Sequence, residues 1–294
     1  MPELPDVRLY QTTLQKKIVG HVLDAVVVRS PFLMRTWEQE PAALVGLRLE
    51  SVKRLGKRLV WCFEKDLFVV IHLMIAGRFH WKNKTASPTS KNDLAAFQFE
   101  HGTMMLTEAS SKKRAGLWIV LGRDAVCVLH KPGLDPLNCE LEDFRTVLLR
   151  RNNTLKRALT DPSRFDGIGN AYSDEILFAA KLSPLQRTEN LTAAEVERLW
   201  GSCRKTLTWW IELLHAQHAN DFPKRVTAFR PEMSVHGKFG KECIECGAPI
   251  QRIRYADNEC NYCPRCQTEG RILADRSLSR LLKDDWPKTL EELE

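Results

Sequence analysis

The sequence lacks the features that mark membrane and secreted proteins. It has no run of about twenty apolar residues, which argues against a membrane-spanning helix. The first residues have neither a basic segment nor an apolar core, so they do not resemble a secretion signal. Repeats and low-complexity tracts are also missing. We therefore expect a folded, soluble protein of the cytoplasm that makes no contact with a membrane.

Acidic residues are in modest deficit. The 37 Asp and Glu residues face 44 Lys and Arg residues, which gives a formal charge of +7 and a pI near 8.9. An excess of this size matters only where it is clustered, and it favours nucleic acid over an acidic membrane as the partner. The 294 residues, 44% of them hydrophobic, are enough for two or three domains with ordinary cores.

Cysteine is plentiful, but signals of disulfide pairing are missing. Five of the nine cysteines are scattered, whereas the other four form two C-x-x-C pairs separated by 16 residues. This spacing is typical of a tetrahedral structural zinc site in a reducing compartment. Cys260 lies in the same segment but off the spacing, so we interpret it as a spare thiol. We predict that one structural Zn²⁺ is bound by Cys243, Cys246, Cys263 and Cys266.

The two halves of the chain have different hydrophobic patterns. Short β-branched or aromatic stretches predict the strands of a sandwich at 19–28, 58–63, 67–73, 96–99 and 117–129. A helix is expected over 6–18. Residues 131–140 contain two prolines and a glycine and are interpreted as a linker. From Leu141 to about His218 the pattern is helical, which predicts a helical domain before the cysteine-rich segment.

The N-terminus carries a chemical signal, because Pro2 and Glu3 directly follow the initiator Met. Removal of that Met would leave a secondary amine that is partly neutral at pH 7. Such an amine condenses with a carbonyl or a sugar C1′ to give a cationic imine, and Glu3 would lie beside the reacting centre. Proline is also common after Met, so this pair alone does not establish a catalytic role.

A second signal is the sequence GIGNAYSDEILFAA. Gly167 and Gly169 predict a tight turn that opens onto a helix starting near Asn170. Backbone N–H groups in such a turn point at an anion, and the Asn170 amide can add a hydrogen bond, so a DNA phosphate is the natural ligand. The alternative is an ordinary helical hairpin with a capping Asn.

Several motifs follow one another in an order that resembles a known family. They are PELPDV at the start, RLGKRLV around Lys57, GLDPL in the linker, GIGNAYSDEILF, and VHGKFGKECIECGAPI leading to NYCPRCQ. Together they resemble the formamidopyrimidine-DNA glycosylase and endonuclease VIII family of base-excision repair enzymes, over residues 2 to about 267. The resemblance implies an α+β fold with an N-terminal β-sandwich, a helix-two-turns-helix domain and a C-terminal zinc-finger β-hairpin, with DNA in the cleft between the two halves.

The expected domain boundaries follow from these motifs and patterns. The catalytic β-sandwich is expected at 1–130, the linker at 131–140 and the helix-two-turns-helix domain at 141–233. The zinc finger is expected at 234–267. A C-terminal extension, 268–294, continues where many relatives stop, and its leucine spacing predicts a short amphipathic helix over 273–286. This helix would either pack on the zinc module or present a basic face to DNA or a repair partner.

The resemblance implies a bifunctional DNA glycosylase and abasic-site lyase that acts, as a monomer, on damaged double-stranded DNA. Pro2 matches the nucleophile that attacks C1′ of the damaged, oxidised nucleotide. Glu3 matches the general acid/base, and Lys57 matches a lysine that contacts phosphate and assists departure of the base. The resulting imine would release the 3′ phosphate by β-elimination and then the 5′ phosphate by δ-elimination.

DNA contacts are also implied by the resemblance, with some departures. Asn170 matches the phosphate clamp of the helical domain, and Lys156 lies where that domain offers another backbone contact. The family fills the space of the flipped nucleotide with a Met from one loop, but here Met74 is displaced by one position and Ile75 takes the aligned place. His72, just before this loop, is either a phosphate ligand or a structural histidine.

Two further positions depart from the family pattern. In SSKKRAGLW the aligned wedge Phe is Ala115, with Lys113 and Arg114 beside it and Leu117 as a possible substitute. In the zinc hairpin, the phosphate-binding Arg of the family aligns with Asn258, which can donate a hydrogen bond but carries no charge.

These departures leave alternatives open. One is a lyase specialised for abasic sites, single strands or unusual lesions. Another is a non-catalytic homologue that binds damaged DNA. Retention of Pro2, Glu3, Lys57 and Asn170 argues against pure binding, and a simple zinc-ribbon regulator does not explain the Pro-Glu start.

Overall fold

The computed structural model describes residues 1–129, 133–219, 221–223, 226, 229–255, 258–275, 279, 281 and 286–293. The chain forms two compact units. Unit 1 comprises residues 1–131 and 210–227, and unit 2 comprises residues 132–209 and 228–294. The segment 210–227 therefore joins the N-terminal unit, whereas the sequence patterns assigned it to the helical domain. Among the described residues, no helix has the length and apolar character needed to cross a bilayer.

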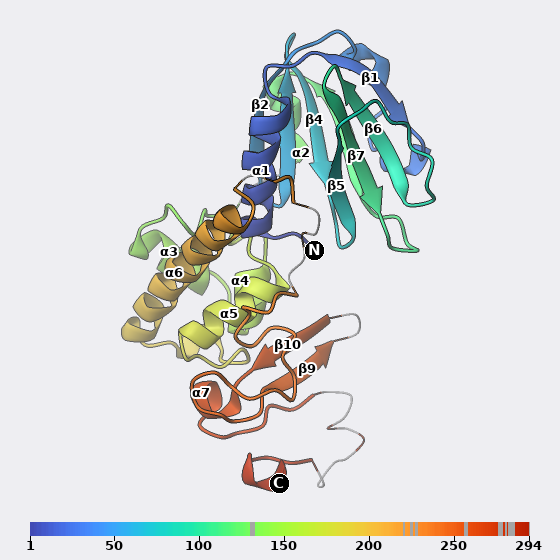
Figure 1. The fold of residues 1–294 in the computed structure, drawn as a ribbon. Helices are drawn as coiled ribbons and strands as arrows, with labels where there is room; N and C mark the ends of the chain where they lie inside the picture. The colour runs from blue at the N-terminus through green and yellow to red at the C-terminus, as the bar shows by residue number, and fades with distance from the viewer. Residues whose placement is uncertain are drawn as a thin grey trace. The chain divides into compact units, whose positions relative to one another are not determined.

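Unit 1 is a β-sandwich with a helix at its start (Figure 1). One sheet has the order β1-β6-β7-β5 and the other β2-β3-β4-β8, and every pairing is antiparallel. The elements are α1 (Leu4–Ile18), β1 (Leu23–Val28), η1 (Pro31–Leu33), η2 (Pro41–Leu44), β2 (Leu49–Leu55), β3 (Arg58–Phe63), β4 (Leu67–His72), β5 (Gly77–Lys82), β6 (Asp93–Phe99), β7 (Gly102–Glu108), β8 (Gly116–Leu121) and α2 (Arg123–Leu129).

The sandwich core lies between the two sheets. The ring of Trp61 in β3 lies 5.7 Å from that of Phe79 in β5 and 4.9 Å from that of Phe97 in β6, measured between centroids. The other face of the second sheet is covered by α2, whose Val126 packs on the cluster around Val70. Strands β3 and β4 are thus buried on both faces, which explains their continuous apolar sequences.

The predicted sandwich and its first helix are confirmed, with local differences. The apolar run 117–129 is not one strand, because β8 ends at Leu121 and α2 begins at Arg123 after Gly122, whose φ is +85°. Three strands, β2, β5 and β7, were not anticipated. Charged and polar residues interrupt their apolar positions, so they lack the continuous apolar runs that identify β3 and β4.

Unit 2 joins short helices to a two-stranded hairpin. Its helix α5 is buried from Ala171 to Phe178 and forms the centre of the unit. The helical segments predicted from Leu141 onward are confirmed. The elements are α3 (Leu141–Leu149), α4 (Leu155–Thr160), α5 (Asn170–Ala179), η3 (Thr188–Asn190), α6 (Ala193–Gln217, which continues into unit 1), β9 (Gln251–Tyr255), β10 (Asn258–Tyr262), α7 (Pro264–Thr268) and η5 (Glu291–Leu293).

The C-terminal extension packs on the β9–β10 hairpin. The Leu273 N–H donates to the Tyr262 hydroxyl at 2.7 Å, and the Arg254 N–H of β9 donates to the Asp275 carboxylate at 2.7 Å. Leu290 joins the apolar cluster that contains Cys243. These contacts agree with the interpretation that the extension packs on the zinc module. Most of the helix predicted over 273–286 lies outside the described residues.

Candidate functional site

The strand register of unit 1 brings three connections to one end of the sandwich. Arg58 of β3 pairs with His72 of β4, and His72 pairs with Gly116 of β8. The β2–β3 turn, the β4–β5 turn 73–76 and the loop 109–115 before β8 therefore lie at the same end of this sheet. We call this the loop end of unit 1, and most of the sequence-predicted site residues of this unit lie on it.

Lys57 lies in a two-residue hairpin turn. Leu55 pairs with Arg58, and the turn between them is Gly56, with φ +64°, followed by Lys57. A positive φ at the first of two turn residues favours glycine and fits the twist of the flanking strands. The next residue holds the turn in place, because the Arg58 guanidinium lies 5.1 Å from the Trp118 ring centroid and donates to the Leu129 carbonyl. Lys57 is thus presented on a fixed turn.

The N-terminus enters unit 1 in a buried environment. Pro2 is buried, and Glu3 is only 2% exposed just before α1. The Glu3 N–H donates to the carboxylate of Asp6 at 3.0 Å, which satisfies a donor at the helix start. The acidic residue in the first helical turn therefore fixes the backbone of Glu3.

The N-terminal amine experiences several charges at once. Burial lowers the pKa of the Met1 ammonium, the carboxylates of Glu3 and Asp6 oppose this, and the charges of Arg78 and Lys57 lower it further. The structure thus brings the N-terminus, Glu3 and Lys57 into one electrostatic environment. Arg78, on β5, is a member that the sequence interpretation missed, because nothing in an isolated Arg distinguishes it from a solvated one.

The β4–β5 turn is tight and strained. Met74 has φ +52°, and its N–H donates to Nδ1 of His72 at 3.1 Å. A side chain at Gly77 would place its Cβ 2.3 Å from the Leu73 carbonyl oxygen, so only glycine fits there. This turn leaves Ile75 55% exposed. The bond from Met74 supports the structural interpretation of His72.

The loop 109–115 is organised by a buried carboxylate. Glu108 accepts the N–H groups of Arg114 at 2.9 Å and Ala115 at 3.1 Å. The Lys113 ammonium lies 3.4 Å from the Asn92 side-chain oxygen and also donates to the Glu108 carbonyl. Arg114 is exposed. These bonds fix the backbone of the loop.

One expectation for this loop is wrong. Leu117 was a possible substitute for the missing wedge residue, but it is 1% exposed and pairs with Ile71 inside the sheet. Ala115 is buried as well. Neither side chain can enter a DNA stack without unfolding the edge of the sheet.

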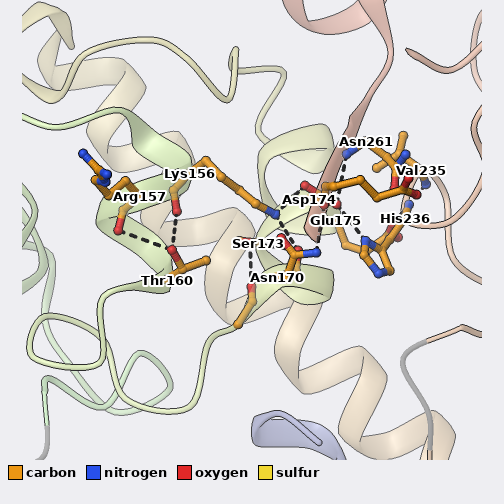
Figure 2. Close-up of polar contacts among 12 residues, drawn as sticks. Lys156, Arg157, Thr160, Asn170, Ser173, Asp174, Glu175, Val235, His236 and Asn261 are labelled. Atoms are coloured by element: carbon orange, nitrogen blue, oxygen red, sulfur yellow. Dashed lines mark hydrogen bonds and ion pairs between the residues drawn. The ribbon is translucent and has the colours of Figure 1, made fainter. Parts of the chain in front are cut away.

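In unit 2 a buried ion pair holds α4, α5 and the segment before the zinc module together (Figure 2). Asp174 accepts from the Lys156 ammonium at 2.6 Å, from Nδ1 of His236 at 2.7 Å and from the Asn261 N–H at 3.1 Å. Burial would raise the pKa of Asp174, but the charge of Lys156 and the bond from His236 outweigh it and hold this pKa below its usual value.

This network directs Lys156 inward, where the sequence had suggested a DNA contact. Its ammonium also donates to the Asn170 carbonyl at 2.5 Å, and the side chain is buried. Lys156 therefore joins α4 to the first turn of α5. Asp174 and His236 were missed by the sequence interpretation, although two acidic residues inside an otherwise apolar helix were a usable signal.

The start of α5 is joined to both neighbouring segments. Glu175 accepts three backbone N–H groups, those of residues 234, 235 and 236, at 2.8 to 2.9 Å (Figure 2). The Asn170 side-chain amide donates to the Glu259 carbonyl of β10 at 2.8 Å. Gly167 has φ +85°, as a tight turn before α5 requires. The predicted phosphate clamp is thus built into the joint between α5 and the hairpin.

The four predicted cysteines form a compact cluster of metal-ligand geometry. All four sulfurs lie within 4.8 Å of one another, with Cys243 to Cys266 at 3.9 Å and Cys246 to Cys263 at 3.4 Å. Tetrahedral zinc with Zn–S bonds of about 2.3 Å requires sulfurs roughly 3.8 Å apart. The donor set and spacing therefore fit such an ion.

Cys260 does not belong to the cluster. It packs with Ile253 and Tyr262 in a separate apolar group, and burial raises its pKa well above the usual value. It stays a protonated thiol, as the spare-thiol interpretation requires.

Asn258 is exposed at the first position of β10, beside the turn of the hairpin. Asn258 pairs with Tyr255 across β9 and β10. The guanidinium of Arg252, on the neighbouring strand β9, lies 4.1 Å from the Phe239 ring centroid and 3.5 Å from the Glu259 carboxylate. Its guanidinium thus has partners within unit 2.

Comparison with known proteins covers both units. The model of the formamidopyrimidine-DNA glycosylase N-terminal domain matches residues 1–114, and that of the formamidopyrimidine-DNA glycosylase H2TH domain matches residues 132–219. A formamidopyrimidine-DNA glycosylase of Latilactobacillus sakei is 31% identical over 275 residues, covering 91% of this chain and 98% of the relative.

Solved structures that resemble this chain are also formamidopyrimidine-DNA glycosylases. The complex of Lactococcus lactis Fpg with DNA containing an abasic site has a TM-score of 0.79 and 27% identity, covering 90% of this chain and 99% of that one. A variant of the same Fpg with DNA containing Fapy-dG also has a TM-score of 0.79 and 27% identity, covering 91% of this chain and all of that one.

Proposed function

Because the chain belongs to the formamidopyrimidine-DNA glycosylase family, we propose that it removes oxidised bases from DNA and cleaves the strand at the resulting abasic site. The observation that carries this proposal is the burial of Pro2 and Glu3 and the electrostatic influence of Lys57 and Arg78 on the chain terminus. Burial and the charges of Arg78 and Lys57 lower the pKa of the Met1 ammonium. In the proposal the Pro2 amine becomes the terminus once Met1 is removed, and the same surroundings favour its neutral, nucleophilic form.

In this proposal Pro2, freed of Met1, is the nucleophile. Its nitrogen lone pair forms a bond to C1′ while the bond from C1′ to the base breaks, and the proton that the nitrogen loses is taken up by the departing base. Glu3 donates a proton to the sugar O4′, so the ring opens and the amine becomes a cationic imine. The imine acidifies C2′, loss of that proton expels the 3′ phosphate, and a second elimination expels the 5′ phosphate.

The other residues bind and orient the DNA. Lys57 on its fixed turn would contact a phosphate and assist departure of the base. Ile75, Met74, Lys113 and Arg114, at the loop end, would contact the strands around the flipped nucleotide. Asn170 and Asn258 would contact phosphates from unit 2, whereas we assign Lys156 to positioning α5 through Asp174.

We propose that the cysteine cluster binds one structural Zn²⁺. Four thiolates fill a tetrahedral shell and leave no open position, so the ion would stabilise the hairpin and take no part in the reaction. We further propose the cytoplasm as the location and the monomer as the active form. None of the nine cysteines, all of which lie in the described part of the chain, forms a disulfide, which suits a reducing compartment.

A lyase specialised for abasic sites is the second candidate. The buried state of Ala115 and Leu117 favours it, because an abasic site requires no displacement of a stacked base. Rates on two matched duplexes, one with an oxidised purine and one with an abasic site, separate the two functions. A rate on the oxidised duplex within about tenfold of the other would support the glycosylase.

The direct test is trapping with borohydride on a duplex with one abasic site. Reduction of the imine should give a covalent adduct that maps to the peptide beginning at Pro2. The matched control is the same chain with one extra residue before Pro2, which converts the secondary amine into an amide. An adduct of equal yield in the control, or none in the folded, DNA-binding parent, would contradict the proposal.

A further inference from the structure

A phenylalanine projects from unit 1 on a well-anchored turn. Phe32 is the central residue of η1 and is 78% exposed, whereas the next two residues, Leu33 and Met34, are buried in the core. Pro31 fixes φ at the first position of the turn. The anchored neighbours therefore hold the Phe32 ring out of the core.

The residues after this turn run along the edge of β8. Met34 forms a parallel bridge with Leu117, and the Arg35 N–H donates to the Leu117 carbonyl at 2.8 Å. The Thr36 hydroxyl donates to the Ile119 carbonyl at 3.0 Å and accepts the Ile119 N–H. Residues 34–36 and β8 thus run in the same direction.

This direction decides where the exposed aromatic residues lie. In a parallel pairing, residues before Met34 lie toward the start of β8, which is the loop end. Phe32 therefore lies beside the loop 109–115, and the Arg35 guanidinium, 3.4 Å from the Ala115 carbonyl and 3.5 Å from the Arg114 carbonyl, ties the two segments together. Trp37, which is 70% exposed, lies toward the other end of β8.

The neighbourhood of Phe32 has the composition of a nucleic-acid surface. Lys112 and Arg114 of the loop are exposed. Lys57 lies at the same end of the sheet but at its opposite edge, on the β2–β3 turn, so the basic neighbours of Phe32 are those of the loop. An exposed aromatic ring within a basic surface is the pattern by which proteins stack on unpaired bases. A single exposed Phe elsewhere would need no explanation, so the argument rests on its place at the loop end.

We propose that Phe32 stacks on the base that loses its partner when the damaged nucleotide is flipped out. The inference rests on the proposed function, because only a flipped nucleotide leaves such a base inside a duplex. The loop 109–115 cannot stack on this base through Ala115, which is buried. Ile75 is exposed at the same end but has no π face for stacking. Phe32 would thus contribute to the choice of opposite base.

The test compares Phe32→Ala, Phe32→Trp and Trp37→Ala in the full chain. The probe is a duplex with a tetrahydrofuran abasic analogue opposite 2-aminopurine, whose fluorescence reports stacking. Stacking of one base on an aromatic ring contributes roughly 1–3 kcal/mol, so Phe32→Ala should weaken binding about tenfold and change the fluorescence of the bound state. Phe32→Trp should bind within about twofold of the parent, and so should Trp37→Ala, because its ring lies away from the loop end.

Trapping with borohydride distinguishes the two proposals. At saturating protein, Phe32→Ala should give as much adduct as the parent on a natural abasic site. Equal affinity and equal fluorescence of Phe32→Ala and the parent, with an adduct in both, would overturn the stacking inference alone. An equal loss of affinity in Trp37→Ala would also overturn it. Failure of the parent to form any adduct would instead overturn the proposed function.

Discussion

In unit 1, Lys57 is presented on a two-residue turn, whereas in unit 2 the ammonium of Lys156 lies 2.6 Å from the fully buried Asp174. Both lysines were predicted to contact DNA. The loop end of unit 1 presents its charges from backbone turns that are fixed by other residues. Unit 2 uses its lysine, histidine and acidic residues to join helices to the hairpin. For these two lysines, burial and the hydrogen-bond partners distinguish the one that can contact a substrate from the one that holds the fold.

Removal of the metal should have the largest effect and should be confined to unit 2. Structural zinc contributes on the order of 10 kcal/mol to folding, so Cys263→Ser or a chelator should unfold the hairpin and abolish DNA binding. The sandwich should remain folded, as two separate transitions in thermal unfolding would show. Cys127→Ser, at an exposed position of α2, is the control and should behave as the parent. A single transition, in which both units unfold together, would contradict the expectation that the effect of metal removal is confined to unit 2.

Paired substitutions of the two lysines should separate stability from activity. Lys156→Met leaves the Asp174 carboxylate buried without its main partner and should cost about 3–5 kcal/mol in the free energy of unfolding of unit 2. Lys57→Met should change stability by less than about 0.5 kcal/mol. It should nevertheless slow borohydride trapping, roughly a hundredfold, because a charge that acts in the transition state is lost. Chemical denaturation measures the stability and single-turnover kinetics measures the rate of trapping. A loss of stability in Lys57→Met, with slow trapping by a stable Lys156→Met, would refute the roles assigned to the two lysines.

The pH dependence of trapping should respond to charge at the loop end. Burial, Arg78 and Lys57 lower the pKa of the Met1 ammonium. We expect the same surroundings to lower the pKa of the Pro2 ammonium that replaces it, so that neutral amine is present at lower pH than for an exposed terminus. Arg78→Gln removes one positive charge and should raise this pKa. The acidic limb of the pH–rate profile should then move to higher pH, by less than about one unit. Arg78→Lys keeps the charge and should leave the limb in place. A shift to lower pH in Arg78→Gln would exclude this electrostatic account.

The smallest effect is expected where the extension meets the hairpin. Asp275→Asn keeps the shape but weakens the bond from the Arg254 N–H, which should cost about 1 kcal/mol in the stability of unit 2. The catalytic rate of unit 1 at saturating DNA should be unchanged. Glu197→Gln, at an exposed position of α6 in the same unit, gives a comparison for loss of an exposed negative charge. Equal stability of the two variants would show that the bond to β9 contributes nothing.

Much of the architecture could be predicted from local patterns. The helices α5 and α6 have clear apolar periodicity, and the cysteine spacing alone identified the metal-ligand cluster. Strands such as β2 were missed because the sequence LESVKRL alternates weakly and carries three charged residues. The orientation of Leu117 depends on its pairing with β4 and the covering of β8 by residues 34–36. Such pairings between distant segments are not encoded in any short window.

The site residues also divide into those that a local motif identifies and those that only the fold brings together. Pro2, Glu3 and Lys57 belong to motifs that can be matched residue by residue. Asp174 and His236 lie 62 residues apart, and only the folded structure brings them together. The inward direction of Lys156 follows from the same long-range contact. The acidic pair Asp174 and Glu175, directly before the apolar residues Ile176 to Phe178, would have been the best warning.

The division of α6 bears on how such a protein can evolve. Its residues up to 209 belong to unit 2, whereas residues 210–227 belong to unit 1, where the ring of Phe222 lies 6.2 Å from that of Tyr10 in α1. A gene fragment that ends after residue 131 would therefore encode the sandwich without part of its own packing. Exchange of the units between relatives by recombination would have to cut the chain at three points at once. We expect the lineage to diversify by substitution in the loops, as at Ala115 and Asn258, and not by swapping domains.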